Sequence, residues 1–315
     1  MQYRRIGQSG LKVSVIGLGT WLNFGGRLEQ ATETDLIDFA CELGINFFDT
    51  ADVYKGGAAE ISLGKSLAPY KRSDLVIASK VYFPTGEGPN DRGLSRKHIF
   101  ESIAETLDRL GTPYLDLYQA HRYDEETSLE EVVRAFGDLV RMGKIHYWGV
   151  SMWSAKEIRD ACRLCKEFNL PLPISNQPVY NLLDRRIERE VVPVCRNFGL
   201  GILPYSPLAQ GALTGKYLGD EMPDDSRGAD DDLNKFMGVY LEDLAAERIA
   251  RMKELSEVAE IEMAHLALGW CLQNDLVASV IVGVTKAEQL EQNSMTADTE
   301  VPDGTYEHLA EIFQE

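Results

Sequence analysis

The sequence lacks what a membrane-spanning or nucleic-acid-binding protein needs. No run approaches the ~18 consecutive apolar residues of a transmembrane helix. Basic residues are scarce, because 32 Lys and Arg stand against 50 Asp and Glu and give a formal net charge of −18 at pH 7. Nucleic acids and anionic membranes both bind basic surfaces. We therefore expect no nucleic-acid partner and no direct membrane insertion.

The sequence also lacks a secretory signal and a disulfide framework. Residues 1–5 lead directly into a strand-like pattern without an apolar signal core, so we expect a cytoplasmic protein. The five cysteines are odd in number and scattered, which is typical of reduced thiols. Cys162 and Cys165 form a C-x-x-C pair inside a helical pattern, and no second pair completes a zinc site. We interpret this pair as structural.

Familiar phosphate-binding motifs are incomplete. The glycine-rich turn at residues 17–22 has Leu22 where the dinucleotide motif G-x-G-x-x-G needs its third glycine. A P-loop ending in Gly64, Lys65 and Ser66 would need a glycine where Ala59 stands. The H-E-x-x-H motif and the nucleophile elbow are also absent. The signatures of these enzyme classes are therefore missing.

What is present is an end-to-end alternation of short apolar runs and amphipathic runs. The strand-like runs cover residues 15–18, 45–49, 75–79, 115–119, 145–150, 173–177, 201–205 and 277–282. The helix-like runs cover residues 32–43, 95–110, 128–142, 154–168, 187–198, 244–259 and 287–293. This alternation predicts an α/β fold, a (β/α)₈ TIM barrel. No linker divides the chain, so we expect residues 1–315 to form a single domain.

Local signals refine this prediction. Thr32 with Asp35 and Ser154 with Glu157 fit the capping pattern of a helix start. Glycines stand where helices should stop, at positions 44, 111, 143 and 199. Residues 3–13 resemble a β-hairpin that would cap the barrel floor. Residues 210–243 form a long acidic segment rich in Gly, Pro and Asp, which is typical of a lid or binding loop.

Titratable side chains follow three consecutive strand-like runs. Asp49 ends the second run, Tyr54 comes shortly after it, Lys80 follows the third and His121 follows the fourth. In a (β/α)₈ barrel the carboxyl ends of the strands meet at one rim, where catalytic residues lie. Each residue alone has an ordinary structural interpretation, which is a turn residue for Asp49, a loop aromatic for Tyr54, a surface lysine for Lys80 and a helix cap for His121. Converging on one rim, they indicate a reaction site.

The chemistry of such a group is specific. A Tyr phenol titrates near pH ~10, and an adjacent Lys⁺ stabilises the phenolate and lowers that pKa. Asp49 can supply the partner that a buried Lys80 needs. We therefore expect Tyr54 to give or take a proton near neutrality. His121 would donate a hydrogen bond to a carbonyl oxygen as that oxygen gains negative charge.

Segments along nearly the whole chain resemble the aldo-keto reductase superfamily. They are residues 17–21, 48–54, 79–80, 149–151, 176–177 and 281–284. Within that superfamily, further segments are similar to the branch that contains the voltage-gated potassium channel β subunits. These are residues 24–26, 93–98, 147–149 and 205–211.

The resemblance implies an NADPH-dependent reductase of aldehydes and ketones, an oxidoreductase acting on a small carbonyl substrate. It places the catalytic tetrad at Asp49, Tyr54, Lys80 and His121, with Tyr54 as the general acid. Animal channel subunits commonly carry Asn where His121 stands, so this residue favours catalysis over a purely sensory role. The channel-subunit branch also implies a homotetramer.

The resemblance further implies which residues bind NADPH or NADP+. Ser151, Asn176 and Gln177 would hold the nicotinamide amide, and Tyr205 would stack on its ring. Arg227 would clamp the 2′-phosphate. Gln292 replaces a frequent acidic residue at the adenosine end. The full set is Gly19, Thr20, Trp21, Asp49, Ser151, Asn176, Gln177, Tyr205, Ser206, Leu208, Gln210, Lys216, Arg227, Gly283, Thr285, Gln289, Gln292 and Asn293.

Two other interpretations stay open. The chain would be an accessory β subunit if it binds NADPH mainly to regulate a membrane channel, although channel subunits often carry an N-terminal extension and here the barrel starts at once. Lys80 would be a Schiff-base lysine in a barrel aldolase, but that leaves Asp49 and Tyr54 unexplained. An aromatic mouth would suit unhydrated carbonyl compounds without selecting one. Its expected members are Trp21, Tyr54, Tyr82, Phe83 and Trp153.

Overall fold

The computed structural model describes residues 1–219, 226, 228–229, 237–240 and 242–314. Within them an eight-stranded parallel sheet runs in the order β10-β3-β4-β5-β6-β7-β8-β9. The strands are β3 (Ile16–Gly19), β4 (Phe47–Asp49), β5 (Val76–Val81), β6 (Leu115–Ala120), β7 (Ile145–Ser151), β8 (Ser175–Gln177), β9 (Gly201–Ile202) and β10 (Val280–Val282). Each lies within one residue of a predicted run or inside it, apart from the ends of β5, which continues to Val81.

The sheet closes on itself between its first and last strands. Isolated parallel bridges join Ile202 to Val277 and Tyr205 to Ile281. The Ile202 amide donates to the Leu276 carbonyl at 2.7 Å, and the Ile281 amide donates to the Pro204 carbonyl at 2.9 Å. The predicted (β/α)₈ barrel is confirmed, and every strand presents its carboxyl end to the same rim.

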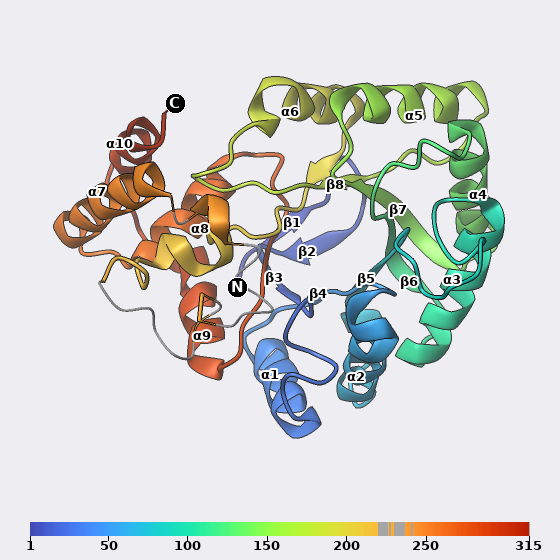
Figure 1. Ribbon diagram of the computed structural model, residues 1–315, viewed down its shortest axis with the longest axis horizontal. Helices are drawn as coiled ribbons and strands as arrows, with labels where there is room; N and C mark the ends of the chain where they lie inside the picture. Colours follow the sequence, from blue (N-terminus) through green and yellow to red (C-terminus); the bar gives the residue numbers. More distant parts are fainter. Residues whose placement is uncertain (220–225, 227, 230–236, 241, 315) are drawn as a thin grey trace.

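Helices surround the strands in Figure 1. They are α1 (Gln30–Glu42), α2 (Ala58–Leu67), α3 (Arg96–Leu110), α4 (Leu129–Arg141), α5 (Ala155–Glu167), α6 (Ile187–Phe198), α7 (Asp243–Ala259), α8 (Met263–Gln273), α9 (Ala287–Met295) and α10 (Thr305–Ile312). The sequence analysis missed α2, α8 and α10. Helix α8 is buried almost all round, so it shows no amphipathic period. Helices α2 and α10 are short, and Gly64 interrupts the pattern of α2.

The predicted helix signals have mixed outcomes. Ser154 and Glu157 form the expected capping box at the start of α5. The prediction for Thr32 is wrong, because α1 already begins at Gln30 and its N-cap Glu29 makes no side-chain cap. The four stop glycines, at positions 44, 111, 143 and 199, all adopt the left-handed conformation that ends a helix.

The N-terminal hairpin is present and seals the barrel floor. Strands β1 (Tyr3–Arg5) and β2 (Lys12–Ser14) pair antiparallel. Ile6 and Val13 are fully buried and pack with residues inside the barrel, such as Phe47. Gly7 has a φ of +54° and lies so close to the barrel that a Cβ there would come within 2.1 Å of the Gly199 carbonyl oxygen. Only glycine fits this approach.

Two predictions concern membrane-spanning helices and the role of the Cys162 and Cys165 pair. None of the described helices is both long and apolar enough to cross a membrane. Cys162 and Cys165 lie buried in α5 as free thiols, and burial raises the pKa of each to about 12. Thiols that stay protonated are poor nucleophiles and metal ligands, which supports their interpretation as structural.

Candidate active site

Three neighbouring strands bring the predicted catalytic group to one point of the rim. Asp49 is the last residue of β4, Lys80 lies near the end of β5, and His121 directly follows β6. Tyr54 begins a short 3₁₀ turn, η1 (Tyr54–Gly57), that follows β4. The structure therefore brings together all four side chains that the sequence analysis selected.

Lys80 is the centre of this group. Its side chain is 0% exposed, and its Nζ lies 2.5 Å from Asp49 Oδ1. The same ammonium donates to the Thr50 carbonyl at 2.7 Å and to the Tyr54 hydroxyl at 3.2 Å. An ammonium has three N–H donors, so every donor of Lys80 has a partner. A buried charge held in this way has a fixed position.

The second oxygen of Asp49 is also occupied. Its Oδ2 accepts from Gln177 Nε2 at 2.8 Å and from Gln119 Nε2 at 3.4 Å. The sequence analysis missed Gln119. Its signal was available, because in β6 it lies two residues before His121, and alternate residues of a strand point to the same face.

Burial decides the protonation of the Tyr54 phenol. Desolvation raises the pKa of Tyr54, and the nearby Lys80 ammonium offsets only part of that rise. The expectation of a phenol that titrates near neutrality is therefore wrong. Burial alone would lower the pKa of Lys80, but Asp49 and Tyr54 outweigh it and raise that pKa. At neutral pH the pair is a protonated phenol beside a protonated ammonium.

His121 is a neutral imidazole at the same pH. Burial, Lys80 and Arg122 lower the pKa of His121 well below its usual range. Its ring centroid lies 5.9 Å from that of Tyr54 and 4.8 Å from that of Phe83. Its Nδ1 is buried with no hydrogen-bond partner among the described residues. The His121 side chain lines the same cavity as Tyr54.

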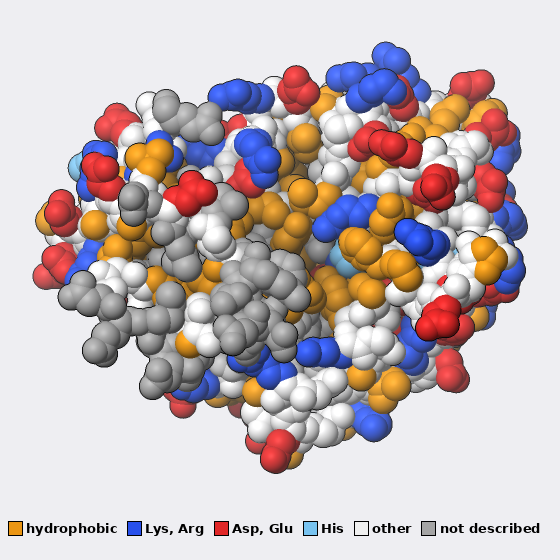
Figure 2. Space-filling view, viewed as in Figure 1, with side chains coloured by type: hydrophobic (Ala, Val, Ile, Leu, Met, Phe, Trp, Pro, Cys, Tyr) orange, Lys and Arg blue, Asp and Glu red, His pale blue; other side chains and the backbone are white. Residues whose placement is uncertain are grey.

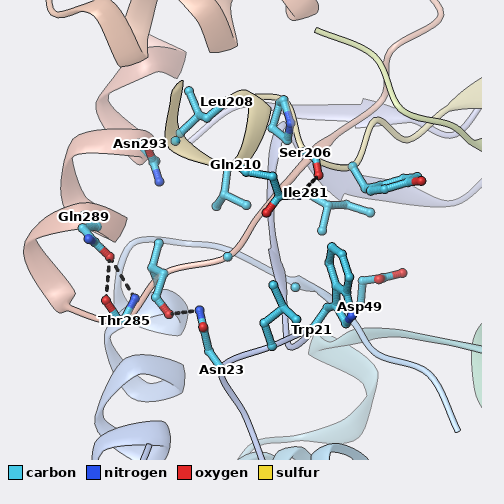
Figure 3. A pocket seen from close by; sticks show the side chains of 18 of the residues that line it. Trp21, Asn23, Asp49, Ser206, Leu208, Gln210, Ile281, Thr285, Gln289 and Asn293 are labelled. Carbon is cyan, nitrogen blue, oxygen red and sulfur yellow. Dashed lines mark hydrogen bonds between the residues drawn. The ribbon is translucent and has the colours of Figure 1, made fainter. Parts of the chain in front are cut away.

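A cavity of about 1120 Å³ opens above this group. Figure 2 shows a hollow on this face, with a histidine visible inside it and hydrophobic, Lys and Arg side chains beside it. In Figure 3, Trp21 and Asp49 lie at one end, and Thr285, Gln289 and Asn293 lie at the other. Pockets for small ligands usually measure ~300–1,000 Å³. This cavity has room for an elongated ligand that contacts both groups of residues.

Most of the predicted coenzyme residues line this cavity. They are Gly19, Trp21, Asp49, Ser151, Gln177, Tyr205, Ser206, Leu208, Gln210, Lys216, Gly283, Thr285, Gln289, Gln292 and Asn293. Thr20 does not, because its hydroxyl bonds Thr50 Oγ1 at 2.9 Å inside the protein. Asn176 does not line it either, and its amide is buried without a partner among the described residues. Arg227 lies outside the described residues.

The chain after β9 reaches the cavity through unusual backbone conformations. Ser206, Ala209 and Gln210 all have positive φ values, of 53°, 48° and 57°. Gln210 Nε2 donates to Ser206 Oγ at 2.5 Å, and Asn181 Nδ2 donates to the Ser206 carbonyl at 2.9 Å (Figure 3 shows the first bond). Left-handed residues other than glycine are costly and cluster at functional sites. The described part of the predicted binding loop does line the cavity, through Gln210, Gly211, Lys216 and Tyr240.

Some lining residues were not predicted, and some predicted ones are elsewhere. Asn23 lines the cavity and donates to the Val284 carbonyl at 2.8 Å. Arg122 follows His121 directly and also lines the cavity.

Of the expected aromatic mouth, Trp21, Tyr54 and Phe83 line the cavity, but Tyr82 and Trp153 do not. Trp153 is 2% exposed and packs on Tyr123 instead.

A second carboxyl group lies just behind the site. Asp52 is 1% exposed, and neither of its oxygens has a hydrogen-bond partner among the described residues. Burial and the nearby Glu60 raise the pKa of Asp52 to about 8. Glu60 itself is paired, because it accepts from Arg109 Nε at 2.6 Å and from Ser79 Oγ at 2.6 Å.

Comparisons with known proteins agree with this geometry. A family model described as "Aldo/keto reductase family" matches residues 15–313. A protein of Arabidopsis thaliana, "Probable voltage-gated potassium channel subunit beta", is 39% identical over 301 residues, which are 95% of this chain and 92% of that protein. A protein of Oryza sativa subsp. japonica with the same name is also 39% identical, with the same coverage.

Proposed function

The chain belongs to the aldo/keto reductase family, and on that premise we propose that it is an NADPH-dependent reductase of aldehydes and ketones. The observation that carries this proposal is the buried relay from Asp49 through Lys80 to the Tyr54 hydroxyl. A protonated phenol beside a fixed ammonium provides the proton and the positive field that a carbonyl oxygen needs as it gains negative charge.

The cavity fits a nicotinamide coenzyme. The cavity extends from the catalytic group to Thr285, Gln289 and Asn293, so it can hold both ends of an elongated molecule. Hydroxyl and amide side chains line the part away from the catalytic group. Ser151 and Gln177 would hold the nicotinamide amide, Tyr205 its ring, Lys216 and Arg227 the phosphates, and the α9 residues Gln289, Gln292 and Asn293 the adenosine. When bound, the coenzyme supplies the hydride.

The chain's own residues then have separate tasks. Lys80 stays charged because Asp49 pairs with it, and it holds the Tyr54 hydroxyl at 3.2 Å. Tyr54 keeps its proton at neutral pH and gives it to the carbonyl oxygen. His121 orients the same oxygen as a neutral hydrogen-bond donor, with the donating nitrogen set by its tautomer. Trp21 and Phe83 line the mouth and exclude water from the reacting atoms.

A coenzyme-oxidation assay tests this proposal. The purified chain is mixed with NADPH and a panel of aldehydes and ketones, and loss of the reduced-coenzyme absorbance is followed. We expect turnover with at least several aldehydes. Tight NADPH binding without any turnover would contradict a reductase. Covalent trapping of a carbonyl compound on Lys80 by borohydride would instead support an aldolase.

The names of the two plant relatives favour a second function. The chain would then be an NADPH-binding β subunit that regulates a membrane channel. Co-expression with a voltage-gated potassium channel, followed by current recordings with and without the chain, tests this function. Unchanged currents and no co-purification would contradict it.

Domain organisation, cellular location and assembly are the subjects of three further proposals. We propose a single domain, which the family match over residues 15–313 supports, and a cytoplasmic location. We also propose a homotetramer. Sedimentation at micromolar concentration checks the assembly, and a single species at the monomer mass of 35.2 kDa would contradict it.

A further inference from the structure

The charge of the cavity differs from that of the whole chain. Asp and Glu outnumber Lys and Arg in the sequence by 50 to 32. The cavity is instead lined by Arg27, Lys55, Arg122 and Lys216, against Asp49 and Glu288. Asp49 is neutralised by Lys80. Among the described residues, the lining of the mouth is therefore locally positive, and a positive cleft concentrates anions.

Three of these cations, Lys55, Arg122 and Lys216, lie at two different places. Lys216 follows the left-handed segment after β9, on the side that we assign to the coenzyme, where its Nζ lies 5.0 Å from the Tyr217 ring. Arg122 and Lys55 instead adjoin the catalytic group, because they follow His121 and Tyr54 directly. Coenzyme phosphates account for the first location but not for the second.

Arg122 is held at the reacting end. Its Nη1 donates to the His121 carbonyl at 2.5 Å, and its guanidinium carbon lies 5.3 Å from the centroid of the Phe83 ring. The ring of Phe83 in turn packs edge-on to the His121 ring. Arg122 also lies close enough to Tyr205 to lower its pKa in part, although burial raises that pKa overall. In the described part of the chain it forms no ion pair with a carboxylate.

These contacts leave Arg122 partly exposed, and no anionic group among the described residues pairs with its charge. A guanidinium has five N–H donors in a planar fork, and Arg122 uses one of them on the His121 carbonyl. The remaining donors can bind a carboxylate or a phosphate through two parallel bonds. The position of the guanidinium over the Phe83 ring adds a cation–π contact that helps to hold it at this end of the cavity.

We propose that the substrate is a carbonyl compound with an anionic group, and that Arg122 binds this group. The proposal rests on the proposed reductase function and adds the substrate class. A carbonyl compound anchored by its anion at Arg122 would be held by a second point besides Tyr54 and His121. Two-point binding restricts the carbonyl to reactive orientations.

A matched pair of substrates tests the proposal. 4-Carboxybenzaldehyde and its methyl ester have similar reactivity and differ in charge. We expect wild-type kcat/KM to be higher for the acid, and Arg122→Gln to lower it roughly 10- to 150-fold for the acid, as for a lost charge-assisted hydrogen bond. The ester should lose far less. Arg122→Lys should keep part of the preference, because it retains the charge without the fork.

Two controls exclude indirect effects. Arg96→Gln removes an arginine from α3 that pairs with Asp138 away from the cavity, and it should leave both substrates unaffected. Binding of 4-(hydroxymethyl)benzoate and of its methyl ester, measured by calorimetry, provides a readout without turnover. Arg122→Gln should weaken only the charged compound. The same comparison of glyceraldehyde 3-phosphate with glyceraldehyde distinguishes phosphate from carboxylate as the preferred anion.

The outcomes separate the two proposals. If the wild type reduces acid and ester equally and Arg122→Gln leaves their ratio unchanged, the anion-binding role is wrong and the reductase function stands. If neither the aromatic pair nor any neutral aldehyde is reduced, the reductase function itself fails. A preference for the acid that disappears in Arg122→Gln, together with weaker binding of the charged alcohol, supports the proposal.

Discussion

The two sides of the barrel rim hold their polar groups in different ways. On the side of β4, β5 and β6 the two ionised groups that lie inside the barrel, Asp49 and Lys80, are buried and bound to each other. On the side of β7 to β10 the polar groups are mostly neutral hydroxyls and amides that face an open cavity. Buried charges are stable only when they are paired, whereas neutral polar groups can face solvent until a ligand binds. The first side is therefore preorganised for chemistry, and the second for binding.

This comparison predicts that substitutions on the two sides change different constants. The largest effect should come from Tyr54→Phe, which removes the proton donor and leaves the cavity shape nearly intact. General acid catalysis contributes typically ~10²–10⁴-fold, so kcat should fall by about that factor. Coenzyme affinity, measured by fluorescence titration, should be nearly unchanged. A variant that keeps more than half of the wild-type kcat would remove Tyr54 from the chemistry.

Arg227→Ala should have the converse effect. The resemblance of its sequence position assigns Arg227 to the 2′-phosphate of NADPH, and one charge-assisted hydrogen bond contributes about 1.5–3 kcal/mol. NADPH should bind roughly 10- to 150-fold more weakly, while NADH, which lacks the phosphate, should change little. Titration of both coenzymes against both proteins measures this. Equal losses for the two coenzymes would mean that Arg227 does not recognise the phosphate.

A smaller effect is expected for His121→Asn. The amide keeps a donor but moves it, so turnover should fall by about tenfold or less, the value of one neutral hydrogen bond. Because the pKa of His121 lies well below its usual range, the variant and the wild type should have parallel pH profiles above pH ~7. Unchanged rates on several aldehydes would leave His121 as a structural residue only.

Asp52 is the exception on the catalytic side, since it is buried but unpaired. Its pKa is raised from 3.8 to about 8 in the folded state. The folded protein therefore keeps a proton that the unfolded chain loses, and stability should fall as the pH rises from about 4 to about 8. Asp52→Asn removes this dependence. The variant should match the wild type in Tm near pH 3 and exceed it near pH 8.

A control of opposite sign exists in the same protein. Burial would raise the pKa of Asp124, but hydrogen bonds from the Leu94 amide and the Thr127 hydroxyl outweigh it and lower that pKa. Asp124→Asn should therefore destabilise the protein near pH 8 and have less effect near pH 3. If Asp52→Asn and Asp124→Asn shift Tm in the same direction at pH 8, burial does not hold a proton on Asp52.

Sequence periodicity predicted most of the fold and failed where its physical basis is absent. Amphipathic helices have a polar face that marks their period, but α8 is buried almost all round and has none. The catalytic side was predictable because strand ends share one rim. Thr20 and Asn176 show the limit, because neighbouring residues at a rim point to opposite sides and the family motif includes both. Arg122 was missed because its importance depends on the charge around it.

The narrowest joint of the barrel lies between β9 and β10. Other neighbouring strands share continuous ladders, but here two isolated bridges, Ile202 to Val277 and Tyr205 to Ile281, hold the wall together. Tyr205 and Ile281 also line the cavity. A ligand that contacts both residues would bridge β9 and β10, where local opening of the barrel wall costs the least free energy. By mass action, the closed barrel would then become more stable as the ligand concentration rises. The coenzyme concentration would then set how quickly proteases degrade the protein.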